Sequence, residues 1–374
     1  MRWLAFGGGV VLIFATFSSV VATLIVPGDT PARVARVVSQ TFNPPFRAFA
    51  RFFPTYERKD RFLALQAPWF LLVLLATWLG LLICGYSIVL WSVTSLGFTG
   101  AIREAGSSIL TLGFASTPTG SATALDLIAA ASGLVIVALL IGYLPALYGA
   151  FNRRERLVTL LEARAGAPAW GPEILWRHQR IGILDNLPSF YQLWEEWCAD
   201  VAETHSTYPV LLWFRSPHPL RSWLTGLLAV LDSAALYLAL CPSTAPSQCR
   251  LCLRMGFTGL RNLADALSVP FDRDPRPDAP LHLTYEEFEQ GVQRLVQIGF
   301  PIERAAEEAW ADFRGWRVNY EEVALALAER IVAIPGPWAG KRRLLGDTVI
   351  PTRRPLDRTP KQPEGTDVTR GMQG

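Results

Sequence analysis

Charged residues are scarce in this sequence: lysine, arginine, aspartate and glutamate make up 18% of its 374 residues. The net charge is only +3, so charge gives no indication of nucleic-acid binding, and we expect no nucleic-acid partner. Hydrophobic residues reach 51%, and the mean hydropathy is +0.25. This composition is too apolar for an ordinary soluble protein and too charged for an entirely transmembrane one. We therefore expect membrane helices joined to a soluble domain.

Cysteine is also scarce, and the familiar catalytic motifs are missing. Five scattered cysteines give no disulfide framework of a secreted protein, so a reducing compartment fits. Cys241, Cys249 and Cys252 offer three thiolates, but a zinc site needs four ligands and no histidine has a supporting spacing, so we expect no metal site. No glycine-rich phosphate loop, nucleophile elbow or nucleotide fingerprint occurs. We expect neither an enzyme nor a cofactor.

Three apolar runs are long enough to cross a bilayer, which takes roughly 20 helical residues. They cover residues 3–26, 67–91 and 124–151. The first run could be a signal peptide, but it is long and no A-x-A site follows it, so a membrane anchor is favoured. A fourth run, residues 220–240, is interrupted by Arg221 and Asp232 and bracketed by prolines. We interpret it as a buried helix of the soluble domain rather than a further span.

Basic residues are distributed unevenly around these runs. Residues 31–62 carry seven of them, and four arginines follow the third run between residues 153 and 164. The segment 92–123 has only Arg103. The positive-inside rule places the first loop and the C-terminal portion in the cytoplasm, and residues 92–123 outside. The expected location is the plasma membrane, and the lipid bilayer is an expected partner.

The segment between the second and third runs is not a plain polar loop. Residues 99–110 have the composition of a short helix, with Thr99 as a candidate N-cap, and they are about half as long as a membrane span. Extended, turn-rich sequence follows at residues 111–120. Non-helical backbone at membrane depth is tolerated only where protein buries it or water lines it. The pattern favours a re-entrant loop whose carbonyls could replace the water shell of an ion, and an ordinary extracellular hairpin is the alternative.

The order of these features resembles the pore module of the two-transmembrane potassium channel superfamily, whose filter reads T-V-G-Y-G or T-V-G-F-G. The resemblance covers roughly residues 67–156, under a third of the chain. It implies a cation channel that conducts a monovalent cation, expected to be K⁺. It also implies a selectivity filter formed by the backbone carbonyls of Thr111, Leu112, Gly113, Phe114 and Ala115.

Two positions depart from the family pattern. Ala115 stands where the family has its second glycine, and Ser116 stands where an aspartate usually follows. A carbonyl ladder needs alternating backbone handedness, which glycine supplies without steric cost. An alanine forced to a positive φ would cost about 1–2 kcal/mol. We therefore expect an altered filter mouth, and the selectivity for potassium stays open.

The third run and the number of pore loops lead to two further predictions. Gly133 lies midway along the run and Pro145 about three turns later, so both are candidate gating hinges, although glycine and proline are also frequent in ordinary membrane helices. A single pore loop per chain supplies one quarter of a four-fold filter. Because closed cyclic symmetry is the usual solution, we expect a homotetramer.

The expected fold is an all-α membrane protein with three transmembrane helices, a re-entrant pore loop between the second and third, and an all-helical cytoplasmic domain. The expected divisions are a transmembrane helix at 1–30, a basic cytoplasmic loop at 31–66, the pore module at 67–152, the helical cytoplasmic domain at 153–334 and a disordered tail at 335–374. The alternative function is a non-conducting, membrane-anchored sensor or scaffold whose helical domain binds a partner.

Overall fold

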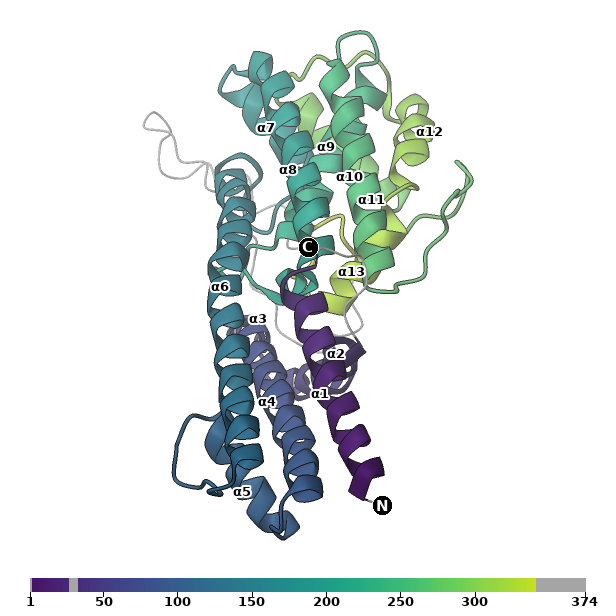
Figure 1. Cartoon of the computed structure of the whole chain (residues 1–374). Coiled ribbons are helices and arrows are strands. Elements are labelled where there is room, and N and C mark those ends of the chain that lie inside the picture. Colours follow the sequence, from purple (N-terminus) through teal and green to yellow (C-terminus); the bar gives the residue numbers. More distant parts are fainter. Residues whose placement is uncertain (1, 27–32, 341–374) are drawn as a thin grey trace.

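The computed structural model describes residues 2–26 and 33–340, and every regular element in these ranges is a helix (Figure 1). The helices of the N-terminal part are α1 (Arg2–Leu24), α2 (Arg33–Phe49), η1 (Ala50–Phe52), α3 (Tyr56–Ala64), α4 (Gln66–Val93), α5 (Phe98–Ile109) and α6 (Gly120–Ala165). The remaining helices are α7 (Gly171–Arg180), η2 (Leu184–Asn186), α8 (Leu187–Thr207), η3 (Pro209–Trp213), α9 (Trp223–Leu240), α10 (Ser247–Ala266), α11 (Tyr285–Gln297), α12 (Ala306–Arg317) and α13 (Glu321–Ile331).

Four of the described helical segments are long and apolar enough to cross a membrane: α1, the α3–α4 segment, α6 and α9. A helix that is apolar all round is either a membrane span or the centre of a large core. Protein buries only 22–39% of the most apolar window in the first three segments, but all of it in α9. The surroundings of α9 therefore fit the core helix expected for residues 220–240.

Helices α1, α4 and α6 form a bundle that lies apart from the larger helical domain (Figure 1). Small residues let α1 and α4 approach closely, because a side chain on Gly9 would lie 2.8 Å from the carbonyl oxygen of Gly85. The Tyr86 hydroxyl on α4 lies 2.8 Å from the Ser132 hydroxyl on α6. Small residues and hydroxyl pairs are the contacts that typically join helices in lipid.

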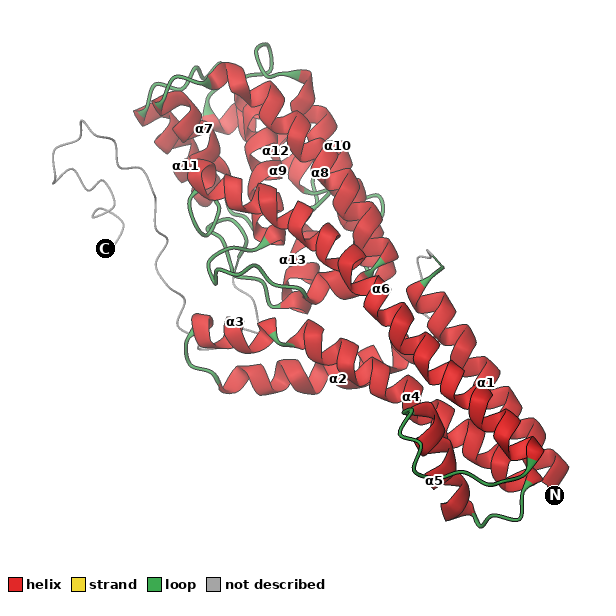
Figure 2. Ribbon diagram, turned by 60° about the vertical axis from the view of Figure 1, so that its left-hand side comes forward, coloured by secondary structure: helices red, strands yellow, loops and turns green. Residues whose placement is uncertain are grey.

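The segment expected as a basic loop, residues 31–66, contains two helices. Figure 2 shows α2 and α3 side by side, between the α1–α4–α6 bundle and the helical domain. The rings of Phe46 on α2 and Phe62 on α3 stack at 4.5 Å, and the Gln66 amide donates to Asn43 at 2.8 Å. We call the segment from α2 to α3 the membrane-proximal hairpin.

Helix α6 is a single helix of 46 residues that leaves the bundle and enters the helical domain (Figure 2). It continues through Pro145, so the expected boundary between residues 152 and 153 falls inside a helix. The guanidinium of Arg154, which is fully buried, donates to the carbonyl oxygens of Leu211 and Phe214 at 2.9 and 2.7 Å. The C-terminal part of α6 is thereby fixed to the segment around η3.

The helical domain is built around α9, all of whose residues are buried. Arg317 on α12 pairs with Asp232 on α9 at 2.6 Å and with Glu321 on α13 at 2.9 Å, so one cation joins three helices. Helix α11 begins after the N-cap residue Thr284, which forms a capping box with Glu287. Trp338 and Ala339 are also buried, so the packed part extends past residue 334, and residues 341–374 of the expected tail lie outside the described residues.

Candidate functional site

The candidate site lies on α5 and on the loop that leads to α6. Helix α5 has 12 residues, a length of about 18 Å, and it contacts both α4 and α6. Gly97 is its N-cap residue, two positions before the expected Thr99. Figure 1 shows α5 and its following loop at the end of the bundle where α4 ends and α6 begins.

The C-terminal end of α5 lies against the first third of α6. A side chain on Gly133 would overlap the carbonyl oxygen of Ile109, the last residue of α5. Gly133 is thirteen residues after Gly120, which corresponds to about 20 Å along α6. Gly133 was expected as a hinge, and the structure gives it a second reason to be glycine, namely the close approach of α5.

Helix α5 ends in a Schellman motif whose left-handed residue is Thr111. The backbone N–H of Leu112 donates to the Ser107 carbonyl at 2.8 Å, and that of Thr111 donates to the Ser108 carbonyl at 3.0 Å. Thr111 has a φ of 57°, which is rare for a β-branched residue. Local strain of this kind costs about 1–3 kcal/mol and is concentrated at functional sites.

The backbone of the expected filter alternates over its first three residues. Thr111 and Gly113 have positive φ angles of 57° and 70°, whereas Leu112 between them does not. Ala115 does not have a positive φ either, so the strain expected there is absent and is found at Thr111 instead. The reason is that the left-handed position is set by the end of α5, not by the family's second glycine.

The side chains of this stretch have few partners within one chain. Leu112 is 60% exposed and Phe114 is 56% exposed, although both are apolar. Arg103 on α5 lies over the Phe114 ring at 5.4 Å. The outer part of the stretch is therefore flanked by one cation, and its apolar side chains are open to a neighbour.

A buried carboxylate holds the loop in place. Glu104 on α5 is 2% exposed, and it accepts hydrogen bonds from the Thr117 backbone N–H at 3.0 Å and from the Thr117 hydroxyl at 2.6 Å. The Ala115 N–H donates to the Ser107 hydroxyl at 3.1 Å. Sequence reasoning missed Glu104. Its signal was an acid within a short, mostly apolar helix, where a carboxylate needs partners to be buried.

Pro145 does not join this site. It lies twelve residues beyond Gly133, about 18 Å further along α6, and α6 is not interrupted there.

The cysteine group, at which no metal site is expected, lies in the helical domain. Cys249 and Cys252 are buried on α10, and the Cys241 thiol donates to the Pro301 carbonyl at 3.1 Å.

A second structural centre joins α6 to the membrane-proximal hairpin. Residues 208–216, which we call the η3 link, accept two hydrogen bonds from Arg154 on α6. From the same link, Arg215 donates to Asp60 at 2.5 Å, to the Tyr56 hydroxyl at 2.9 Å and to the carbonyls of Ile331 and Val332 at the end of α13. Burial raises the pKa of Asp60, and the adjacent guanidinium of Arg215 opposes that rise. The η3 link therefore contacts both the helix before α4 and the C-terminal part of α6.

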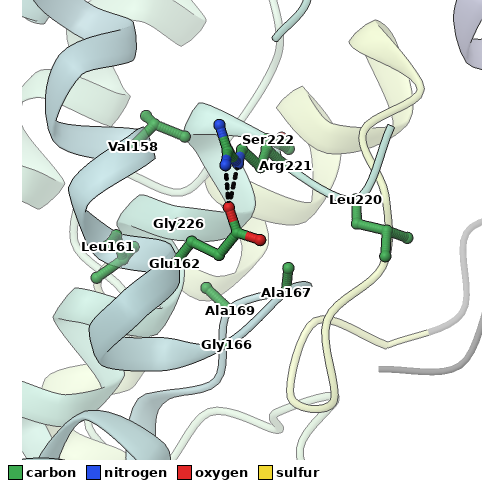
Figure 3. A pocket seen from close by; sticks show the side chains of 10 residues that line it. All are labelled: Val158, Leu161, Glu162, Gly166, Ala167, Ala169, Leu220, Arg221, Ser222 and Gly226. Atoms are coloured by element: carbon green, nitrogen blue, oxygen red, sulfur yellow. Dashed lines mark hydrogen bonds and ion pairs between the residues drawn. The ribbon is translucent and has the colours of Figure 1, made fainter. Parts of the chain in front are cut away.

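The pocket in Figure 3 lies in the helical domain, away from α5. It is a shallow space between the C-terminal part of α6 and the beginning of α9. The ion pair between Arg221 and Glu162 crosses this pocket, so the two charged side chains of its lining are paired with each other. None of the expected filter or hinge residues lines this pocket.

No family model, curated protein or solved structure matches this chain.

Proposed function

We propose that the protein is a cation channel, expected to conduct potassium, in which four chains each contribute residues 111–115 to one filter. The observation that supports this most strongly is the position of α5: it ends against Gly133, about 20 Å along α6, and a non-helical segment follows. In a membrane-inserted bundle of α1, α4 and α6, this makes α5 and its loop a re-entrant element. The helical domain then lies in the cytoplasm.

The end of α5 suits a cation electrostatically. The C-terminus of a helix carries a partial negative charge of about half an elementary charge, and a short helix that ends within the bilayer directs it toward the centre of the pore. The backbone after α5 supplies carbonyl oxygens, which can replace the hydration shell of an ion. Glu104 stabilises this loop through Thr117, so the carbonyls are held before an ion arrives.

The proposed tetramer would cover surface that is unpartnered in one chain. Leu112 and Phe114 are more than half exposed. Helix α6 also has an exposed, mostly small-residue stripe with a repeat of three and four residues: Ala124, Ile128, Ala131, Val135, Ala138 and Gly142. Such a repeat gives one straight face on a helix, as an inner helix around a symmetry axis requires.

Replacing Gly113 by valine tests the filter. Gly113 has a φ of 70°, and no atom lies within 4 Å of the position of an added Cβ, so the substitution acts through backbone strain rather than through crowding within the chain. We expect Gly113→Val to abolish cation flux in reconstituted liposomes while expression and oligomeric mass are unchanged. The matched control is Gly106→Val, because Gly106 also has open space but an ordinary φ.

Bi-ionic reversal potentials in planar bilayers would measure the selectivity of the wild type. Equal conduction by wild type and Gly113→Val would remove residues 111–115 from the ion path. A complete lack of flux in the wild type would favour the alternative, a non-conducting membrane-anchored sensor or scaffold.

A further inference from the structure

The membrane-proximal hairpin carries an excess of positive charge beside the proposed membrane surface. Residues 33–66 contain seven basic and two acidic residues, and one of the acids, Asp60, is already paired with Arg215. The hairpin follows α1 and leads directly into α4, and both of these are candidate spans. If α1 and α4 cross the membrane, both ends of the hairpin are tethered close to the lipid headgroups.

Cations approach one another where this hairpin meets α13, without an acidic partner. Arg47 on α2 donates to the carbonyl of Arg330, and the pKa of Arg47 is lowered by burial and then by the nearby charges of Arg330 and Arg51. Among the described residues, none of these three arginines forms an ion pair with a carboxylate. Like charges held together in this way favour the binding of an anion.

Apolar rings project from the same region. Phe49 is 54% exposed and Phe52, next to Arg51, is 80% exposed. Their rings contact each other at 5.6 Å, and Phe49 also contacts Phe62 on α3 at 5.4 Å, so the rings are held in place by the hairpin. On the same helix, Arg33 and Val37 are exposed as well. Exposed arginines interleaved with exposed phenylalanines are typical of helices that lie in the membrane interface.

We propose that α2 and η1 bind anionic phospholipids of the cytoplasmic leaflet, with Arg33 and Arg51 contacting the headgroup phosphates and Phe49 and Phe52 contacting the acyl region. A soluble phosphate compound would leave the two phenylalanines exposed to water, and an acidic protein segment would compete with the nearby membrane surface. A lipid supplies both the negative charge and the apolar phase. The proposal requires that α1 and α4 span the membrane, but it does not require that the channel conducts.

The experiment compares lipid retention by the full-length protein in native mass spectrometry. The test variant is Arg33→Gln with Arg51→Gln, since neither side chain makes a hydrogen bond or ion pair among the described residues. The matched control is Arg250→Gln with Arg254→Gln, which removes two exposed arginines from α10 in the helical domain. We expect affinity for phosphatidylglycerol to fall about fivefold per arginine, or about 25-fold in the test variant, and to stay unchanged in the control.

Three further results bear on the proposal. Phosphatidylcholine should bind equally to wild type and to both variants, and Phe49→Ala with Phe52→Ala should weaken phosphatidylglycerol binding without changing the oligomeric mass. An equal loss in the test and control variants, or no loss in either, would overturn the proposal. Full competition by soluble glycerophosphoglycerol, which has the headgroup but no acyl chains, would overturn the assignment to a lipid.

Discussion

Gly133 is the residue at which two helices leave no room for a side chain. The carbonyl oxygen of Ile109 occupies the position that a Cβ would take. We expect Gly133→Ala to destabilise the bundle by about 1–3 kcal/mol, because α5 must shift away from α6. Thermal unfolding of the purified protein, followed by fluorescence-detected size exclusion, measures this.

The control for Gly133→Ala is Gly142→Ala on the same helix. No atom lies within 4 Å of a Cβ added there, so alanine should be neutral or slightly stabilising through its higher helix propensity. If both variants unfold at the wild-type temperature, α5 does not lie against α6 as described. A hinge role of Gly133 would show up separately, as altered flux in a variant that retains its stability.

Individual residues also show how much of the candidate site could be predicted from the sequence. The stretch T-L-G-F-A could be recognised from the sequence, and Gly113 does take the positive φ that a glycine at this position permits. The position of the other residue with a positive φ could not be predicted, because it depends on where α5 ends. The Ser107 and Ser108 carbonyls receive the Leu112 and Thr111 N–H groups, and this puts Thr111, not Ala115, in the left-handed region.

At the scale of elements, the η3 link connects two helices that leave the α1–α4–α6 bundle separately. Arg215 donates four hydrogen bonds to groups on α3 and at the end of α13, while Arg154 joins the same link to α6. The side chains of Arg215 and Asp60 are 11% and 9% exposed. Removal of one partner from a buried ion pair is more costly than the pair is worth, because the other charge stays buried without compensation.

We expect Arg215→Ala to destabilise the contact between the hairpin and the helical domain by about 3–5 kcal/mol. Hydrogen–deuterium exchange should become faster in α3 and in residues 331–334, while α8 stays protected. The control is Arg221→Ala, which breaks the partly exposed pair with Glu162 near the same link and should cost about 1 kcal/mol or less. Unchanged exchange in α3 would show that Arg215 does not hold the hairpin.

The core helix expected at residues 220–240 could be read from its apolar run, and α9 lies within that range. The helices of the hairpin could not be predicted from the sequence. Pro44, Pro45 and Pro54 are typical of a loop, yet Pro44 and Pro45 lie inside α2, where contacts with α3, α4 and the helical domain stabilise the helix. Tertiary packing overrode the local preference, and a single sequence does not reveal such packing.

At the scale of the whole molecule, the proposed filter requires four chains. The detergent-solubilised protein should have a protein mass of about four times the 41.4 kDa of one chain. Native mass spectrometry measures it directly. A monomer or a dimer as the sole species would be incompatible with a four-fold filter.

The proposed orientation can be tested with single cysteines in a cysteine-free background. An impermeant maleimide added to intact cells should label Ser116→Cys in the loop after α5 and should not label Leu251→Cys, which is an exposed position on α10. Permeabilised cells should show both, which controls for reactivity. Labelling of Leu251→Cys in intact cells would mean that α9 crosses the membrane and that the helical domain is not a single cytoplasmic body.

The complete burial of α9 has a consequence for the synthesis of the protein. The insertion machinery reads hydropathy as the chain emerges, and α9 is apolar enough to be inserted into lipid. Helices α10, α12 and α13, which help to cover it, follow over about the next 90 residues. At a synthesis rate of about 5–20 residues per second, these helices are completed roughly 5–20 s after α9. During that interval Asp232, at the centre of α9, is the charge that disfavours its insertion, before Arg317 has been synthesised to neutralise it.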